Sequence, residues 1–298
     1  MFERILLPLD GSRLGEGIIP YVGQIARGFG ARVTVLYVAS PEASARPTIT
    51  RVPDGKVVPV PAYLDEMEGP LAEAGVATAD SDMVTGAPAA EIVRYAEGKG
   101  YNLIAMATHG RSGPGRWVYG STTDKVLHST RLAMLLLRPP TGPAPAPERL
   151  PVHTAIVPLD GSELAEAVLP TVVQVAARLD LKVALVRVVP TAAMGYGGFE
   201  PYAYDPKIDE QIGAAADDYL RQKSDELKGQ RVHVGWHRLR GYPATQIIEL
   251  AERTGAGMIV MSTHGRSGVG RWVLGSVADR VLRSSHHPVL LMRSKGSA

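Results

Sequence analysis

The sequence predicts an α/β protein of two tandem doubly wound domains, each a five-stranded parallel sheet with helices on both faces. The first observation behind this prediction is an internal repeat, since RILLPLDGS at residues 4–12 corresponds to TAIVPLDGS at 154–162. The second is that short Ile-, Val- and Leu-rich runs alternate with segments of helical period, which is typical of covered parallel sheets. A chain of 298 residues that is 45% hydrophobic has enough apolar content for two such cores.

The first strand is predicted where an apolar run ends in an aspartate. A helix is expected after it, because apolar residues recur there at the spacing of one helical face. In the first half these residues are Leu14, Ile18, Val22 and Ile25, and in the second half they are Leu164, Val168, Val172 and Val175. The second strand follows, where VTVLYV at 33–38 matches VALVRV at 183–188.

Further apolar runs complete five strands in each half. In the first half we expect strands at 4–9, 33–38, about 79–84, 102–107 and 133–138. Their counterparts are expected at 154–159, 183–188, about 231–238, 257–262 and 288–293. Helical segments between them would cover the two faces of each sheet.

The segment before the third strand distinguishes the halves. In the first half we expect a Pro-rich loop at 41–61 and then a short helix at about 62–74. In the second half the sequence predicts a longer helix at about 209–227. The offset between repeats grows from 150 to 155 residues across this region, so five residues are added here.

A Pro-rich stretch separates the repeats. PPTGPAPAPERLP at 139–151 contains six prolines, which disfavour helix and sheet and favour an extended linker. The predicted domains are therefore residues 1–138 and 152–298.

Composition indicates which kinds of partner and which cellular compartment to expect. Lys plus Arg exceeds Asp plus Glu by only 32 − 30 = 2, which argues against a nucleic-acid partner. The chain has no cysteine, and its first residues lack the pattern of a secretory leader, so we expect a cytoplasmic protein. We expect no association with a membrane, because apolar runs stay well short of the ~18 residues that a span needs.

A Gly-rich loop follows the fourth predicted strand of each half. THGRSGPGRWVYGS at 108–121 and THGRSGVGRWVLGS at 263–276 agree at 12 of 14 positions. Glycines at the carboxyl edge of a parallel sheet allow backbone N–H groups to approach an anion, and the helix that follows presents its positive end. Phosphate is the expected guest. The candidate ligands are His109, Gly110, Arg111 and Gly113 in one loop, and His264, Gly265, Arg266 and Gly268 in the other.

This arrangement resembles the universal stress protein family, whose ATP-binding branch carries G-x2-G-x9-G-[ST] after the fourth strand. The pattern is matched from Gly110 to Gly120-Ser121 and from Gly265 to Gly275-Ser276. Ala107 and Ser262 replace its first glycine. The resemblance implies a Rossmann-like fold of the adenine nucleotide α-hydrolase type. It also implies ATP in each half, alone or with Mg²⁺.

The same resemblance implies roles for residues outside the loops. Asp10 and Asp160 would lie beside the nucleoside, although each also fits a turn residue or helix cap. The backbone at Val38 and Val188 would bind the adenine edge. Near the phosphates the resemblance places Ala107, Gly120, Ser121 and Thr122, with Ser262, Gly275, Ser276 and Val277 as counterparts.

Two groups of residues have a simpler structural interpretation. Ser121 and Ser276 precede Asp124 and Asp279 by three residues, which matches a capping-box pattern. Gly86 and Gly241 precede a proline at a predicted helix start, so helix entry accounts for them.

The expected function is that of a nucleotide-dependent sensor or regulator. The sequence shows no paired carboxylates, Ser–His–Asp arrangement or metal-site pattern, so we expect at most weak ATP hydrolysis and no dedicated metal site. Two alternatives stay open: a slow ATPase or nucleotidyl-transfer enzyme, and a protein-interaction module with one degenerate pocket. We also expect a protein partner. The last strand of each half would leave a sheet edge with unpaired backbone groups. The resemblance implies that the two halves pair through these strands as an intramolecular pseudo-dimer, with a homodimer as a further assembly.

Overall fold

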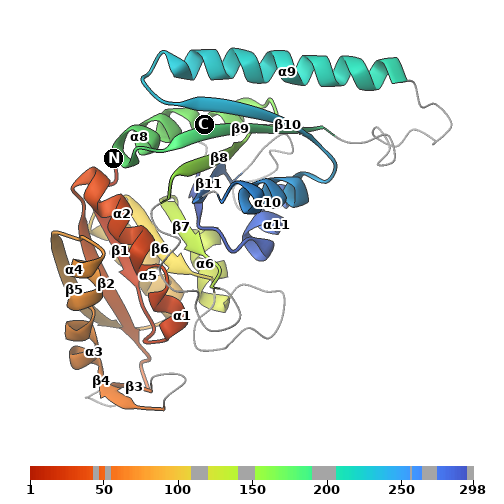
Figure 1. Cartoon of the computed structure of the whole chain (residues 1–298). Helices are drawn as coiled ribbons and strands as arrows, with labels where there is room; N and C mark the ends of the chain where they lie inside the picture. The colour runs from red at the N-terminus through yellow and green to blue at the C-terminus, as the bar shows by residue number, and fades with distance from the viewer. Residues whose placement is uncertain are drawn as a thin grey trace. The chain divides into compact units, whose positions relative to one another are not determined.

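The computed structural model describes residues 1–42, 47–50, 55–108, 120–139, 152–189, 206–255, 257–263 and 274–293. Contacts divide the chain into two compact units. The first unit comprises Met1–Pro151 and Pro288–Arg293, and the second comprises Val152–His287 and Ser294–Ala298. Figure 1 follows the chain through both.

The first unit contains a sheet whose central strand is buried at Ile5, Leu6 and Leu7. Five of its strands are parallel: β1 (Arg4–Pro8), β2 (Arg32–Ala39), β5 (Thr78–Thr85), β6 (Leu103–Ala107) and β7 (Ala133–Leu137). They run in the order β7-β6-β1-β2-β5. Because the chain moves outward from β1 in both directions, the strand order reverses between β1 and β6. In open α/β sheets a ligand crevice lies outside the carboxyl ends at such a point.

A strand from the far end of the chain joins this sheet. β12 (Val289–Met292) pairs antiparallel with β7, with Val289 opposite Leu136. Arg293, just after β12, donates a 2.8 Å hydrogen bond from Nη2 to the carbonyl of Leu127. Burial lowers the pKa of the Arg293 guanidinium, and the neighbouring Arg131 lowers it further. The run expected at 288–293 thus forms a strand, but its contacts belong to the first unit.

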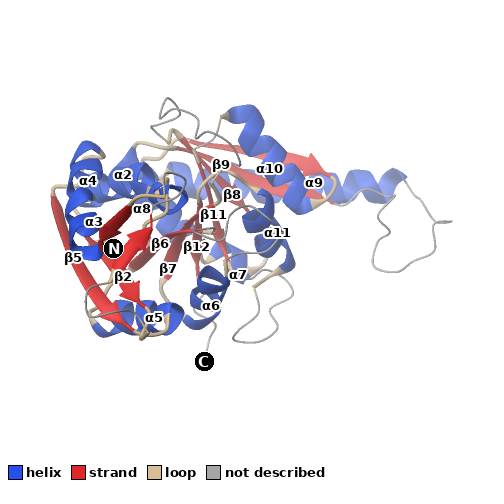
Figure 2. Cartoon of the chain, turned by 90° about the horizontal axis from the view of Figure 1, so that it is seen from below, coloured by secondary structure: helices blue, strands red, loops and turns tan. Residues whose placement is uncertain are grey.

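Helices cover both faces of the first unit's sheet. They are α1 (Arg13–Glu16), α2 (Ile19–Phe29), α3 (Val60–Glu66), α4 (Glu68–Glu73), α5 (Pro88–Gly98) and α6 (Ser121–Ser129). In Figure 2, α2, α3 and α4 lie on one side of the strands, and α5 and α6 lie on the other.

The structure corrects three expectations for this unit. The expected first helix is two helices, α1 and α2, and the helix expected at about 62–74 is divided into α3 and α4. Part of the expected Pro-rich loop at 41–61 forms a hairpin of β3 (Thr48–Thr50) and β4 (Val57–Pro59). Ile49 of this hairpin is fully buried, so the hairpin contributes to the core.

The second unit contains four parallel strands in the order β10-β9-β8-β11. They are β8 (Thr154–Pro158), β9 (Lys182–Val189), β10 (Val234–Arg240) and β11 (Met258–Ser262). The third strand therefore begins three residues later than its expected start at about 231. The helices are α7 (Glu163–Glu166), α8 (Leu169–Leu179), α9 (Pro206–Lys228), α10 (Pro243–Thr254) and α11 (Ser276–Ser284). Among the described residues, no helix is both long and apolar enough to span a membrane.

The long helix α9 runs beside β10 (Figure 1) and is joined to Glu166, the last residue of α7, by a polar cluster. The Tyr219 hydroxyl donates to Glu166 Oε1 at 2.8 Å, and Lys223 Nζ lies 2.9 Å from Glu166 Oε2. The guanidinium of Arg187 lies over the Tyr219 ring, 4.7 Å from its centroid. Burial raises the pKa of the Tyr219 phenol, and its hydrogen bond to Glu166 raises it further.

We predict that this phenol makes the second unit sensitive to alkali. Its pKa is raised by folding, so its contribution to stability is complete below the unfolded pKa of about 10 and is lost as the pH rises further. Tyr219→Phe should cost about 1–2 kcal/mol near neutral pH. The difference in unfolding free energy between wild type and variant should decrease above about pH 10, as measured by thermal unfolding. A difference that stays constant across this range would contradict the prediction.

Candidate functional site

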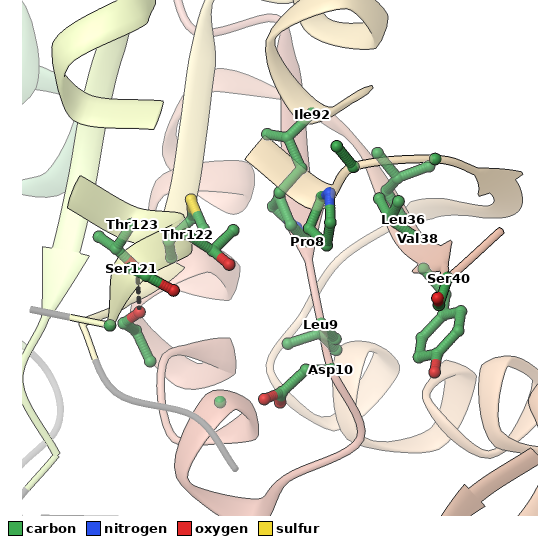
Figure 3. Close-up of a pocket in the computed structure, with 18 of the residues that line it drawn as sticks. Pro8, Leu9, Asp10, Leu36, Val38, Ser40, Ile92, Ser121, Thr122 and Thr123 are labelled. Carbon is green, nitrogen blue, oxygen red and sulfur yellow. Dashed lines mark hydrogen bonds between the residues drawn. The ribbon is translucent and has the colours of Figure 1, made fainter. Parts of the chain in front are cut away.

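A cavity of about 590 Å³ lies at the carboxyl ends of β1, β2 and β6 in the first unit (Figure 3). Its lining combines an apolar wall with a carboxylate, hydroxyl groups and the start of a helix. The lining residues are Pro8, Leu9, Asp10, Gly15, Leu36, Tyr37, Val38, Ser40, Pro41, Gly86, Ala87, Pro88, Ile92, Met106, Ala107, Thr108, Gly120, Ser121, Thr122 and Thr123. The cavity thus occupies the crevice that the strand order predicts.

Asp10 is held at the end of β1 by a tight turn. Its Oδ1 accepts hydrogen bonds from the backbone N–H of Ser12 at 3.0 Å and from the Ser12 hydroxyl at 2.6 Å. Ser12 caps α1, since its hydroxyl oxygen accepts from the N–H of Gly15 at 3.1 Å. The aspartate is therefore a turn residue and not the helix cap. The same turn presents it to the cavity.

The first turn of α6 forms another side of the cavity. Gly120 is its N-cap, and among the described residues no side chain caps this turn. The capping-box interpretation of Ser121 is therefore wrong, because its hydroxyl does not satisfy the helix N–H groups. The first N–H groups of a helix lack partners within it and carry its positive dipole end. Ser121 and Thr122 bring this end of α6 to the cavity.

Two hydrogen bonds connect the start of α6 to the last residue of β6 and to the residue that follows it. The N–H of Gly120 donates to the carbonyl of Thr108 at 2.7 Å, and the Thr123 hydroxyl donates to the carbonyl of Ala107 at 3.1 Å. In the described part of the chain, only Asp180 and Arg231 combine a side chain with a positive φ. Ala107 and Ser262 therefore replace the glycine of the family pattern without backbone strain.

The apolar wall lies opposite the start of α6. Figure 3 shows Leu36, Val38 and Ser40 on one side of the cavity and Ser121 and Thr122 on the other. Pro8, Ile92 and Met106 extend the apolar surface. A flat aromatic ring would pack against this wall while phosphates reach the helix start.

Sequence reasoning missed part of this lining. Ser40 carries a hydroxyl just beyond the end of β2, and Gly86 lines the cavity besides leading into α5. The repeated Gly-x-Pro before the third helix of each half was a usable signal for Gly86. Ser40 had none, because its counterpart in the repeat is Pro190.

The second unit repeats the local geometry. Asp160 Oδ1 accepts from the N–H of Ser162 at 3.0 Å and from its hydroxyl at 2.6 Å. Gly275 is the N-cap of α11 and donates its N–H to the carbonyl of Thr263 at 2.8 Å. Among the described residues no side chain caps α11, so the capping-box interpretation of Ser276 is also wrong.

The remaining candidates of the second unit lie at the same edge of its sheet. Val188 is near the end of β9, Ser262 ends β11, and Val277 is in the first turn of α11. Eight loop candidates lie outside the described residues: His109, Gly110, Arg111, Gly113, His264, Gly265, Arg266 and Gly268. The described residues contain no cluster of three or more His, Asp or Glu side chains suited to a metal ion.

Comparisons with solved structures agree with this architecture. A universal stress protein from Archaeoglobus fulgidus superposes with a TM-score of 0.63 at 20% identity, over 98% of this chain and 97% of that one. A Pseudomonas aeruginosa protein described as functionally unknown gives a TM-score of 0.67 at 16% identity, over 98% and 92%. At these identities the likeness establishes the fold alone.

Sequence comparisons identify the family. A universal stress protein of Methanocaldococcus jannaschii is 31% identical over 140 residues, which are 46% of this chain and 80% of that protein. One of Bacillus subtilis is 26% identical over 143 residues, which are 46% and 97%. The universal stress protein family model matches twice, at residues 1–138 and 151–293. The chain therefore belongs to the universal stress protein family and carries the family's domain in tandem.

Proposed function

We propose that each half of the chain binds an adenine nucleotide, ATP in the first instance, and that the protein acts as a nucleotide-dependent regulator. The observation that carries this proposal is the cavity of about 590 Å³, which joins an apolar wall, a carboxylate and an uncapped helix start. Its volume lies within the range of small-molecule sites, about 300–1,000 Å³.

The chemistry of the lining matches the parts of a nucleotide. The apolar wall at Leu36, Val38 and Ile92 suits a purine ring. Asp10 suits the ribose, because a carboxylate accepts hydrogen bonds from hydroxyl groups but repels phosphates. Ser121 and Thr122 suit the phosphates, because helix N–H groups and hydroxyls donate to anions.

The expected affinity is that of a sensor. Four to six charge-assisted hydrogen bonds contribute about 1.5–3 kcal/mol each. Association costs about 4–15 kcal/mol, which leaves room for a dissociation constant of about 1 μM. Mg²⁺ is expected to arrive with the triphosphate and to keep most of its waters, since the described residues provide no acidic cluster for it.

We infer regulation in preference to efficient catalysis. Fast phosphoryl transfer needs a positioned nucleophile, a metal clamp and added positive charge on the transferred phosphate. In the described lining, Asp10 is the one acidic side chain and no Lys or Arg is present. Bound ATP would instead favour one arrangement of the loops at 108–121 and 263–276, which a protein partner then recognises.

Isothermal titration calorimetry of the full chain with ATP tests the proposal. We expect micromolar binding with two molecules per chain, and much weaker binding of CTP, whose smaller base covers less of the apolar wall. Limited proteolysis should show protection of the two loops when ATP is present. Calorimetry without a signal at millimolar ATP would overturn the proposal.

A further inference from the structure

The two halves differ at the base end of the predicted sites. Ala87 lines the cavity of the first unit. The repeat places Tyr242 at the same position, because each follows a glycine of positive φ and precedes the first proline of a helix. The backbones agree, with φ and ψ of −76° and 118° at Ala87 and −75° and 121° at Tyr242. The Cβ of Tyr242 therefore takes the place of the alanine methyl.

Tyr242 carries a large aromatic ring where the first half has a methyl group. It is 61% exposed, so much of this side chain is accessible from solvent. Its phenol ring is carried by the turn between β10 and α10. The corresponding turn of the first half lines the cavity. An aromatic ring at such a place is suited to stack on a nucleobase, a contact that stabilises binding by about tenfold or more.

At the phosphate end, it is the first half that carries more side chains able to bind the ligand. The first turn of α6 contributes the hydroxyls of Ser121 and Thr122 to the cavity, whereas the Thr123 hydroxyl already donates to the carbonyl of Ala107. In the first turn of α11, Ser276 keeps its hydroxyl, but Val277 and Ala278 replace the two threonines. A hydroxyl bonded to a charged phosphate strengthens binding by about tenfold or more. The second half therefore offers fewer donors to phosphate.

Arg187 does not restore these donors. It replaces Tyr37, which lines the first cavity at the end of β2, and so it lies at the strand side and not at the helix start. Its guanidinium lies over the Tyr219 ring and beside Gly161. The Arg187 guanidinium is therefore already in contact with other residues of the second unit.

We propose that the two sites select their ligands by different parts of the molecule. This inference rests on the proposed function, because it assumes that each half holds an adenine nucleotide. The first-half site depends on phosphates and binds ATP far more tightly than adenosine. The second-half site depends on the stacked base and binds adenosine and adenine nucleotides with similar affinity. It would therefore stay occupied by dephosphorylated ligands when ATP falls.

Reciprocal exchanges between the halves test this inference, with ATP and adenosine titrated by calorimetry into the full chain. In the wild type we expect about a hundredfold preference for ATP at one site and less than about tenfold at the other. Thr122→Val should weaken ATP about tenfold at the first-half site and leave adenosine unchanged. Val277→Thr should strengthen ATP at the second-half site.

The tyrosine exchange provides the complementary test. Tyr242→Ala should weaken adenosine and ATP by the same factor, about tenfold, at the second-half site. Ala87→Tyr should strengthen adenosine binding at the first-half site. Tyr242→Phe retains the ring and should bind as the wild type does. Because Tyr242 is 61% exposed, its replacement should leave the fold intact, which circular dichroism checks.

The outcomes separate this inference from the proposed function. Two sites with equal preference for ATP over adenosine would overturn the inference and leave the proposed function standing. A Tyr242→Ala variant that binds adenosine as the wild type does would overturn it as well. Absence of any signal with either ligand would overturn both.

Discussion

Alanine in place of Gly11 is expected to destabilise the first unit by about 2–5 kcal/mol. Gly11 has a φ of +84°, where a residue with a side chain is strained by about 1–2 kcal/mol. A Cβ there would also lie 2.3 Å from Cγ2 of Ile49, which is fully buried in the β3–β4 hairpin. This collision forces the hairpin to shift and adds about 1–3 kcal/mol.

The repeat supplies a matched control for this prediction. Gly161 has the same φ of +84°, but a Cβ there meets the guanidinium of Arg187 at 3.1 Å, which is the far end of a long side chain and not a buried core group. Gly161→Ala should therefore cost the strain alone, about 1–2 kcal/mol. Hydrogen exchange resolved by peptide would assign each loss to its unit. Equal losses at the two glycines would refute the collision with Ile49.

A double-mutant cycle sharpens the comparison. In an Ile49→Ala background the collision is absent, so the added cost of Gly11→Ala should fall to the value at Gly161. A cost that is unchanged in this background would assign the whole effect to backbone strain.

Loss of the Asp10 carboxylate is expected to weaken ATP binding at the first-half site by about ten- to a hundredfold. In the proposed complex this carboxylate accepts hydrogen bonds from the ribose hydroxyls. Asp10→Ala removes the acceptor, and Asp160→Ala should do the same at the second-half site. Each variant should affect one of the two sites in calorimetry.

Asp10 also holds the turn at Ser12, so a second comparison separates the two roles. Asp10→Asn retains an oxygen for the Ser12 hydrogen bonds and should preserve the melting temperature. With 2′,3′-dideoxy-ATP, which lacks both ribose hydroxyls, wild type and Asp10→Ala should bind alike at this site. If Asp10→Ala weakened both nucleotides equally, the ribose contact would be excluded.

The repeat made most of the sheet predictable, and prolines account for much of what sequence reasoning missed. Pro20 lacks an N–H donor and crowds the carbonyl four residues earlier, which separates α1 from α2. The apolar spacing of Leu14, Ile18 and Val22 continues across this break and concealed it. Prolines also suggested a loop where β3 and β4 pair. The hairpin tolerates Pro59 because this residue lies at the end of a short ladder, opposite Thr48.

The part of the candidate site that lies at the carboxyl ends of the strands was predictable from the sequence. The structure brings Asp10, Val38 and Ala107 to one cavity, together with the start of α6, as the alternation of strands and helices predicts. Their role in binding stays a prediction. The capping-box pattern was misleading because sequence spacing does not show where a helix begins. α6 starts at Ser121 itself, so this serine cannot act as its N-cap.

The placement of β12 has a consequence for how the protein is made. The ribosome releases β1, β2, β5, β6 and β7 in one stretch, but residues Val152–His287 of the second unit are synthesised before β12 emerges. Nascent domains fold as units in order of emergence, so β7 waits with one edge unpaired while translation proceeds. The sheet of the first unit is thus completed only after the four strands of the second unit have been synthesised.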